Sequence, residues 1–197
     1  MKFPAIFLAS RSPRRAELLR QMGVHFAVLN AAVDETPLLA EQPLAYVQRV
    51  ACDKALAGYQ FMRQQADHRP VLAADTAVVV GQQIYGKPQD VEQARWMLQQ
   101  LSGRTHQVIT AVALVDLTGK IHSRHCCSDV SVTRLSDADI DWYLATTEGQ
   151  DKAGGYAVQG LAALFIEKIS GSYSGIMGLP IYETGQLLNA ITMGMPE

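Results

Sequence analysis

The order of strand-like and helix-like segments is the feature that most constrains how this 197-residue chain can fold. Near its start, a short apolar strand at 5–9 is followed by an amphipathic helix and then by a second short strand at 26–29, which is the order of a βαβ unit. In the middle, strand-like runs are joined by short turns, as in antiparallel hairpins. This mixture predicts an α/β protein with a mixed sheet flanked by helices rather than a purely parallel sheet.

Turn and cap residues set the expected boundaries of these segments. Ser12 and Pro13 indicate a helix N-cap and the first helical residue, and Gly23 indicates the end of that helix. Asp90 begins another helix, with Gln93 placed to complete a capping box. The expected helices span 13–22, 43–64, 90–101, 136–145 and 180–191, and the expected strands span 5–9, 26–29, 71–74, 77–80, 83–85, 108–117, 121–133 and 161–169.

Composition narrows the class of protein. Lys and Arg number 17 against 19 Asp and Glu, which excludes a strongly basic, non-specific nucleic-acid binder but leaves room for a local basic patch. No apolar run is long enough for a membrane span, and the N-terminal apolar stretch is too short for a signal peptide. Cys52, Cys126 and Cys127 form neither an even disulfide set nor a zinc-like spacing, so a reduced cytoplasmic protein is expected. The length and the lack of a linker predict one domain over 1–197.

Two arginines stand where the first helix begins, in the run Ser10–Arg15. If Ser12 is the N-cap, Arg14 and Arg15 fall in the first turn, where cations oppose the helix dipole. A bound phosphate would resolve this conflict, because helix N-termini and arginine side chains both bind phosphate. The alternative is a solvated pair of surface arginines.

A single carboxylate, Asp75, directly follows the fully apolar segment Val71–Ala74. Such a carboxylate is costly unless it is paired, hydrogen-bonded or bound to a metal. Open α/β sheets place their ligands at the carboxyl ends of strands, which favours a functional role. The alternative is an Asx-turn residue that caps neighbouring N–H groups. Together with Glu35 in its acidic loop, Asp75 could hold a hard cation through oxygen ligands.

Two lysines and a glycine-rich segment complete the set of candidates. Lys87 lies in the tight loop Gly86–Pro88, and Lys54 lies near the apolar border of its helix, where it could instead extend its ammonium into water. The three glycines of 151–160 suit either a backbone close to a ligand or a plain connecting loop. The chain has neither a P-loop nor a dinucleotide-binding fingerprint. Arginines, lysines and carboxylates in this combination suit a magnesium-bound polyphosphate.

These motifs, in this order, resemble those of the Maf family of nucleoside triphosphate pyrophosphatases. The resemblance covers nearly the whole chain and rests on Leu8–Arg15, the Glu35 loop, Lys54, Ala74–Thr76, Gly86–Pro88, Leu101–Gly103, Asp151–Gly154, Gln159 with Gly160, and Gly178–Pro180. It implies a fold similar to that of inosine triphosphate pyrophosphatases, with two lobes and a central cleft. It also implies hydrolysis of a nucleoside triphosphate to the monophosphate and pyrophosphate with a divalent cation, Mg²⁺ or Mn²⁺.

Within the family, Ala74–Thr76 and Lys152–Gly160 resemble the branch that acts on dTTP and UTP. The branch that prefers 7-methyl-GTP has Ser-Asp-Gln, and a Glu before the late glycine. Specificity positions of the family carry over to Arg14, Thr76 and Gln159. Two residues depart from the family pattern: Arg11 stands where a small residue is common, and Gly155 stands where alanine is common. Neither is expected to change the chemistry.

The resemblance assigns a role to each matching residue. The substrate-binding residues would be Ser10, Ser12, Arg14, Arg15, Thr76 and Gln159. The catalytic residues would be Asp75, Glu35, Lys54 and Lys87, and the metal ligands Glu35 and Asp75. Asp75 would take a proton from the attacking water, although whether it is chiefly a base or a metal ligand stays open.

The resemblance also bears on partners and leaves rival functions open. Family members are cytoplasmic and often dimeric, so a homodimer is expected, with no nucleic-acid polymer or membrane as partner. Some members are named septum formation inhibitors, so one rival is a non-catalytic nucleotide-binding regulator of cell division. The other is a pyrophosphatase that clears modified nucleotides.

Overall fold

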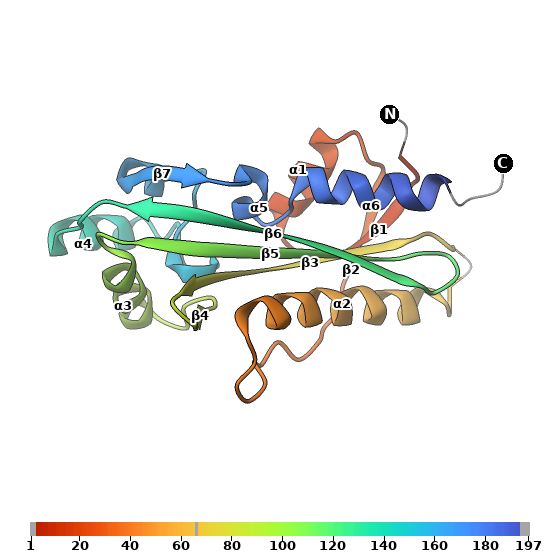
Figure 1. The fold of residues 1–197 in the computed structure, drawn as a ribbon, viewed down its shortest axis with the longest axis horizontal. Helices are drawn as coiled ribbons and strands as arrows, with labels where there is room; N and C mark the ends of the chain where they lie inside the picture. Colours follow the sequence, from red (N-terminus) through yellow and green to blue (C-terminus); the bar gives the residue numbers. More distant parts are fainter. Residues whose placement is uncertain (1–2, 66, 194–197) are drawn as a thin grey trace.

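The computed structural model describes residues 3–65 and 67–193, and the rest of the domain expected over 1–197 lies outside the described residues. Within those ranges, seven strands form one sheet in the order β2-β1-β3-β5-β6-β7, with β4 paired to β3. The strand β1 runs parallel to β2 and β3, whereas the other pairings are antiparallel (Figure 1). The strands are β1 (Ile6–Ala9), β2 (Phe26–Leu29), β3 (Val71–Val80), β4 (Gln83–Tyr85), β5 (Thr105–Val115), β6 (Ile121–Val132) and β7 (Ile166–Ser170). The predicted mixed α/β fold is confirmed.

Helices cover both faces of this sheet (Figure 1). The long helix α2 (Pro43–Met62) lies on one face, and α1 (Pro13–Gln21) and α6 (Ile181–Met193) lie on the other. At the opposite end of the sheet lie α3 (Val91–Leu101) and α4 (Asp137–Ala145). The short helix α5 (Tyr173–Met177) and the 3₁₀ turns η1 (Ala153–Gly155) and η2 (Leu161–Phe165) complete the set. Every helix in the described part of the chain is too short or too polar to span a lipid bilayer.

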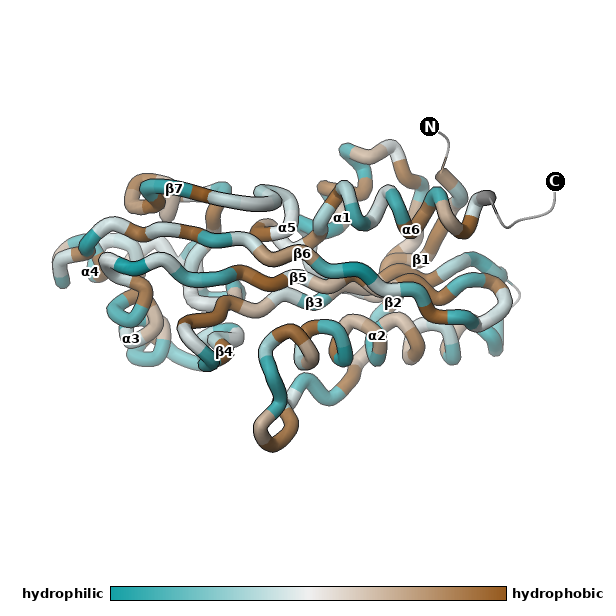
Figure 2. Tube along the Cα trace, in the orientation of Figure 1, coloured by the Kyte–Doolittle hydropathy of each residue, from teal (hydrophilic) through white to brown (hydrophobic). Residues whose placement is uncertain are grey.

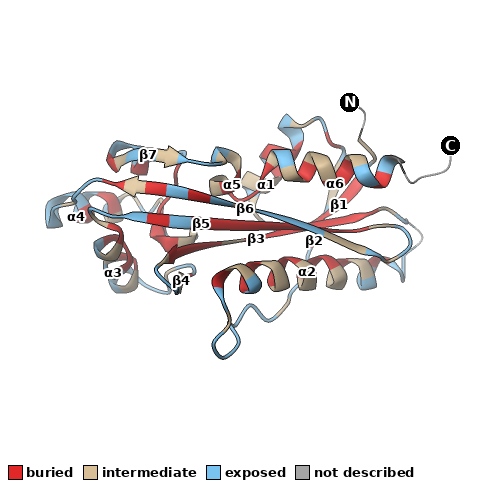
Figure 3. Cartoon of the chain, viewed as in Figure 1, coloured by how far each residue is buried: buried red, intermediate tan, exposed pale blue. Residues whose placement is uncertain are grey.

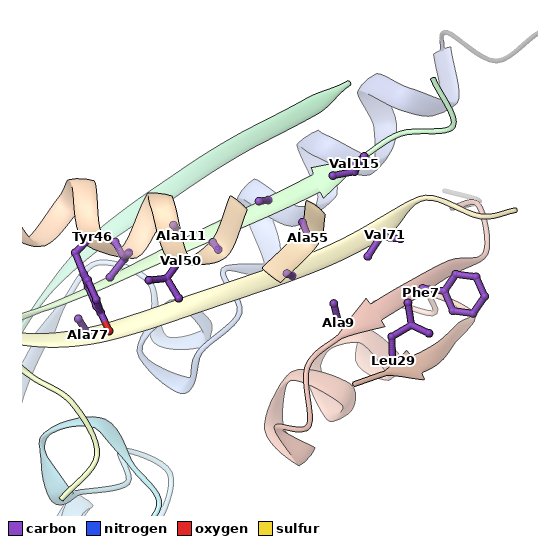
Figure 4. Close-up of a cluster of buried hydrophobic side chains, with 14 of the residues drawn as sticks. Phe7, Ala9, Leu29, Tyr46, Val50, Ala55, Val71, Ala77, Ala111 and Val115 are labelled. Carbon is purple, nitrogen blue, oxygen red and sulfur yellow. The ribbon is translucent and has the colours of Figure 1, made fainter. Parts of the chain in front are cut away.

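The central strands are apolar on both sides because both of their faces are covered. Nearly all of β3 and the second half of β5 are buried (Figure 3), and these strands contain long hydrophobic stretches (Figure 2). Side chains of β1 alternate between the two faces: Phe7 packs in the cluster under α2, whereas Leu8 packs in the cluster under α1 and α6. In the first of these clusters, Tyr46 and Val50 of α2 lie over the sheet (Figure 4).

A third hydrophobic cluster forms the other end of the molecule. It joins α3 and α4 to the ends of β5 and β6, with Leu98, Tyr143 and Phe165 among its buried members. The first two clusters and the third therefore define two lobes that share the long strands. This arrangement matches the expectation of two lobes, and a cleft lies where the two lobes meet.

Three expectations about secondary structure were wrong or incomplete. The strand β3 does not end before Asp75 but continues through it to Val80, because the carboxylate finds partners within the fold. Only Ile166–Ser170 of the expected strand at 161–169 is a strand, and Leu161–Phe165 is a 3₁₀ turn. A short apolar run has no periodicity that separates these two forms. The helix α5, with five residues, was not predicted.

Helix caps agree with the sequence only in part. Asp90 accepts a hydrogen bond from the Gln93 backbone N–H, as expected, but the Gln93 side chain bonds to the N–H of Gln89 instead of closing a capping box. Ser12 has the extended backbone of an N-cap, yet its side chain makes no cap hydrogen bond. The first turn of α1 is therefore left without the side-chain cap that Ser usually provides.

Candidate active site

One cleft between the two lobes gathers all ten predicted site residues. It has a volume of about 830 Å³ and is bordered by the start of α1, the loop after β2, the middle of β3 and the segment 151–159. The predicted residues that line it are Ser10, Ser12, Arg14, Arg15, Glu35, Lys54, Asp75, Thr76, Lys87 and Gln159. The sequence could name these side chains but could not show that they converge.

The Lys54 ammonium joins two carboxylates in the cleft. Its Nζ lies 2.8 Å from Asp75 Oδ1 and 2.9 Å from Glu35 Oε2. Lys54 and Asp75 are buried, whereas the Glu35 side chain is 53% exposed. Three separate elements supply this triad: α2 carries the lysine, β3 the aspartate and the loop after β2 the glutamate. Extension of the Lys54 ammonium into water, the alternative considered from sequence, is therefore wrong.

Asp75 is a buried carboxylate in the interior of the sheet. It pairs with Ala111 of β5 in the strand register, so the Asx-turn alternative is wrong. Burial raises its pKa above the ordinary value, and the positive charges of Lys54 and Arg15 only partly oppose this rise. A carboxylate with a raised pKa accepts a proton more readily near neutral pH, as a general base must.

Arg15 ties three parts of the cleft wall together. Its Nε donates to the Gly178 carbonyl at 2.8 Å, its Nη1 to Ser10 Oγ at 3.2 Å and its Nη2 to Thr76 Oγ1 at 3.4 Å. Burial lowers its pKa, and the negative charge of Asp75 opposes that effect. Arg15 is thus not a solvated surface arginine. Three of its N–H groups are already used in hydrogen bonds within the protein.

Arg14 is the arginine more available to a ligand. Its Nε donates to the Met177 carbonyl at 3.3 Å, and the half-buried side chain lines the cleft. Burial lowers the pKa of Arg14, and the nearby charge of Asp151 raises it. The neighbouring helix end lacks a side-chain cap, so backbone N–H groups and a guanidinium are both at hand for an anion.

The remaining predicted residues divide into a fixed one and two exposed ones. Thr76 Oγ1 accepts hydrogen bonds from Thr110 Oγ1 at 3.0 Å and from Arg15, which fixes its hydroxyl. Lys87 and Gln159 are exposed residues on the opposite lobe, and both line the cleft. Their long side chains are therefore placed to meet a ligand that enters from solvent.

Sequence reasoning gave no role to three further side chains of the cleft. Tyr46 is buried, lines the cleft and donates its hydroxyl to the Glu35 carbonyl oxygen at 3.0 Å, which anchors the Glu35 loop on α2. A tyrosine within the apolar stripe of a helix needs a polar partner, and that signal could have identified it. Asp151 and Lys152 form an ion pair at the edge of the cleft, where the sequence showed only the flank of a glycine-rich segment.

The donor set of the cleft suits a hard divalent cation in its chemistry. Magnesium is commonly held by one or two carboxylates together with substrate phosphates and water. Asp75 and Glu35 supply two such carboxylates, which already face one shared cation, the Lys54 ammonium. In the ranges 3–65 and 67–193, no group of three or more His, Cys, Asp and Glu side chains forms a metal cage. The remaining ligands would have to come from substrate and solvent.

Comparisons with known proteins show which family the chain belongs to. A family model described as "Maf-like protein" matches residues 5–191. A protein of Alkalilimnicola ehrlichii named dTTP/UTP pyrophosphatase is 49% identical over 94% of this chain and 92% of its own length. Proteins with the same name from Aromatoleum aromaticum and Xanthomonas oryzae pv. oryzae are 51% and 50% identical, each over 94% of this chain and 94% and 97% of their own lengths.

One solved structure supports the fold alone. The structure of a HAM1 protein from Coxiella burnetii superposes with a TM-score of 0.52 at 17% identity, and it covers 96% of this chain and 98% of its own. The likeness extends over both lobes, so the two-lobed α/β architecture is shared well beyond recognisable sequence similarity.

Proposed function

The chain belongs to the Maf-like protein family, and we propose that it is a nucleoside triphosphate pyrophosphatase that hydrolyses dTTP and UTP to the nucleoside monophosphate and pyrophosphate. Relatives about 50% identical over most of the chain carry the name of that activity. The observation that carries the proposal is the triad of Asp75, Lys54 and Glu35 in the cleft that the Ser10–Arg15 turn borders.

In this proposal the phosphate chain lies along the Ser10–Arg15 turn, that is, the loop after β1 together with the first residues of α1. The uncapped N–H groups of α1 and the Arg14 guanidinium bind its oxygens, and Lys87 approaches from the other lobe. Arg15 holds the turn against Gly178 and Thr76 and adds positive charge to the wall. These cations neutralise the charge of the phosphates and of the transition state in a partly buried site, where such interactions are strong.

Asp75 is the proposed general base. Its carboxylate takes a proton from the attacking water as a P–O bond of the phosphoanhydride breaks, and pyrophosphate leaves. Lys54 orients Asp75 and Glu35, because its ammonium contacts both, and its positive charge partly opposes the rise in the pKa of Asp75. Asp75 and Glu35 would also hold Mg²⁺ or Mn²⁺, which when bound neutralises phosphate charge and polarises the P–O bonds.

Removal of divalent cations is expected to lower pyrophosphate release by about 100-fold or more, since a metal ion contributes several kcal/mol to transition states of this kind. The measurement is pyrophosphate release from dTTP with and without EDTA, followed by addition of excess Mg²⁺ or Mn²⁺. Recovery of activity on re-addition shows that the chelator did not damage the protein. Full activity in EDTA would contradict the proposed cofactor.

Gln159 gives a physical account of the choice of pyrimidine. Its carbonyl oxygen can accept from N3–H of uracil or thymine while its NH₂ donates to O4. Cytosine presents the opposite pattern, an acceptor at N3 and an amino donor. Gln159→Ala is therefore expected to lower the ratio of kcat/KM for UTP to that for CTP by about 10- to 100-fold, the effect of leaving such groups unpaired. The matched control is Gln82→Ala, at an exposed turn outside the cleft. An unchanged ratio would contradict the recognition of the pyrimidine by Gln159.

A panel of canonical and modified nucleoside triphosphates tests the function as a whole. Rapid release of pyrophosphate from dTTP and UTP supports the proposal. Much faster turnover of a modified nucleotide would keep the mechanism and change the physiological substrate. Binding without turnover of any nucleotide would favour a non-catalytic regulator.

From the family resemblance we also propose that the protein is cytoplasmic and that its single domain forms a homodimer. Light scattering on the purified protein measures the mass of the particle and so tests whether it is a dimer.

A further inference from the structure

The turn that carries Gln159 is held by its backbone at both ends. The Gly160 N–H donates to the Ala157 carbonyl at 3.0 Å, which closes a four-residue turn with Gln159 near its tip. The Ala157 N–H donates to the Tyr143 hydroxyl at 3.1 Å, and the Leu161 N–H donates to Glu148 Oε1 at 2.9 Å. Both anchors therefore come from outside the turn, from the end of α4 and the residues after it.

Tyr143 and Glu148 form one connected network. The Tyr143 hydroxyl donates to Glu148 Oε2 at 2.9 Å while it accepts from Ala157, so the carboxylate receives one hydrogen bond on each oxygen. Tyr143 is buried, with its ring edge-to-face with Phe165 at 5.2 Å, and burial raises the pKa of its hydroxyl. The hydroxyl thus stays protonated and remains a donor to Glu148.

The backbone around this network is shaped to bring Glu148 into position. Thr147 has a φ of +58°, a left-handed conformation that is rare and strained for a β-branched residue. A Cβ at Gly149 would lie 1.9 Å from the Gly155 carbonyl oxygen, and one at Gly160 would lie 1.9 Å from Glu148 Oε1. The two glycines allow the chain segments to meet, and Gly160 leaves room for the Glu148 carboxylate.

We propose that Tyr143 and Glu148 are positioning residues for base recognition, which act by fixing the backbone of the turn that presents Gln159. Neither side chain is among those that line the cleft. Recognition by an amide needs such a support, because both of its hydrogen bonds to the edge of uracil or thymine require the Gln159 side chain at one distance and angle from the base. A fixed backbone holds the start of that side chain in place, whereas a turn that shifts would lengthen both hydrogen bonds. This inference rests on the proposed function of the cleft.

The test compares Tyr143→Phe, Glu148→Gln and Gly160→Ala with the wild type. The first removes only the hydroxyl, the second leaves one acceptor for two donors, and the third forces the Glu148 carboxylate aside without altering it. Each is expected to lower the UTP-to-CTP ratio of kcat/KM by about 3- to 10-fold, mainly through KM for UTP. Combining Tyr143→Phe with Gln159→Ala should lower the ratio no further than Gln159→Ala alone. Tyr182→Phe, on an exposed tyrosine of α6, is the matched control and should behave as wild type.

A second measurement reports on the backbone independently of activity. Amide hydrogen exchange should become faster at Ala157 in Tyr143→Phe, where this amide loses its acceptor, and at Leu161 in Gly160→Ala, where the added Cβ pushes the accepting Glu148 oxygen aside. A wild-type protein that releases no pyrophosphate overturns the proposed function itself. An active wild type whose UTP-to-CTP ratio persists in Tyr143→Phe and Gly160→Ala, with or without faster exchange, overturns the positioning role alone. If one variant does not fold, the other gives the same decision.

Discussion

Replacing Asp75 by asparagine is expected to lower kcat for dTTP and UTP by about 10²- to 10⁴-fold, the usual contribution of a positioned general base. Asparagine keeps the shape of the side chain and an oxygen that can accept from Lys54 Nζ, but it cannot take a proton from water. The measurement is pyrophosphate release at saturating nucleotide. Asp129→Asn, at an exposed position of β6, is the control. Activity close to that of the wild type would exclude Asp75 both as base and as metal ligand.

The stability of the Asp75→Asn variant separates a catalytic role from a structural one. Because burial raises the pKa of Asp75 in the folded state, its ionisation opposes folding: the stabilising contribution is present at low pH and is lost as pH rises. A neutral isostere avoids that cost, so Tm near neutral pH should stay unchanged or rise while activity is lost. Such an exchange of stability for activity is typical of functional sites.

The same shift in pKa predicts the pH profile of the wild-type enzyme. The base works only when it is deprotonated, so kcat/KM should fall as pH drops through the raised pKa of Asp75. This acid limb should lie above the range in which an ordinary aspartate titrates, and the residual activity of Asp75→Asn should not show it. A profile of kcat/KM against pH for both proteins measures the difference.

The sequence predicts the architecture well because local patterns decide it. The bounds of α1, α2 and the β5–β6 hairpin are predicted to within a few residues. The signals are apolar runs, turn residues, and residues typical of helix starts and ends. The pattern fails where local signals are ambiguous. Leu161–Phe165 is as apolar as a buried strand, yet its backbone forms a 3₁₀ turn. This 3₁₀ turn directly follows the turn that carries Gln159, and its first N–H donates to Glu148. A helix as short as α5 is below the length at which periodicity is detectable.

The candidate site shows the same division at the level of single side chains. The residue types and their order identify Asp75, Lys54 and Arg15, but their partners are set by tertiary packing. For Lys54 the sequence left open an ammonium extended into water, and the side chain is instead buried between two carboxylates. Arg15 was expected at the phosphates, and it also supports Gly178, a contact across 163 residues of sequence. No local rule contains pairings of this range, and they decide which cation binds substrate and which holds the cleft.

Replacing Lys54 by methionine is expected to lower kcat/KM by about 10²-fold or more and also to destabilise the protein, because it removes the cation shared by Asp75 and Glu35. Methionine retains most of the length and the apolar contacts of the lysine stem. Without the ammonium, the pKa of Asp75 rises further, so less of the base is deprotonated near neutral pH. The acid limb of the activity profile should therefore move to higher pH than in the wild type.

The stability of Lys54→Met should depend on pH in a direction that only a buried, unpaired carboxylate explains. Removing one partner of a buried ion pair typically costs about 3–5 kcal/mol, but Asp75 can escape that cost by binding a proton. The deficit in the free energy of unfolding should then be small at pH values below the raised pKa of Asp75 and should grow as pH rises through it. Urea unfolding at several pH values measures this free energy for the wild type and for Lys54→Met.

The double variant Lys54→Met with Asp75→Asn is the control. No buried carboxylate remains at position 75, so the double variant should be more stable than Lys54→Met alone at pH 8. A deficit that is the same at all pH values, or a double variant less stable than the single one, would mean that Lys54 contributes through packing and not as the counter-charge of Asp75.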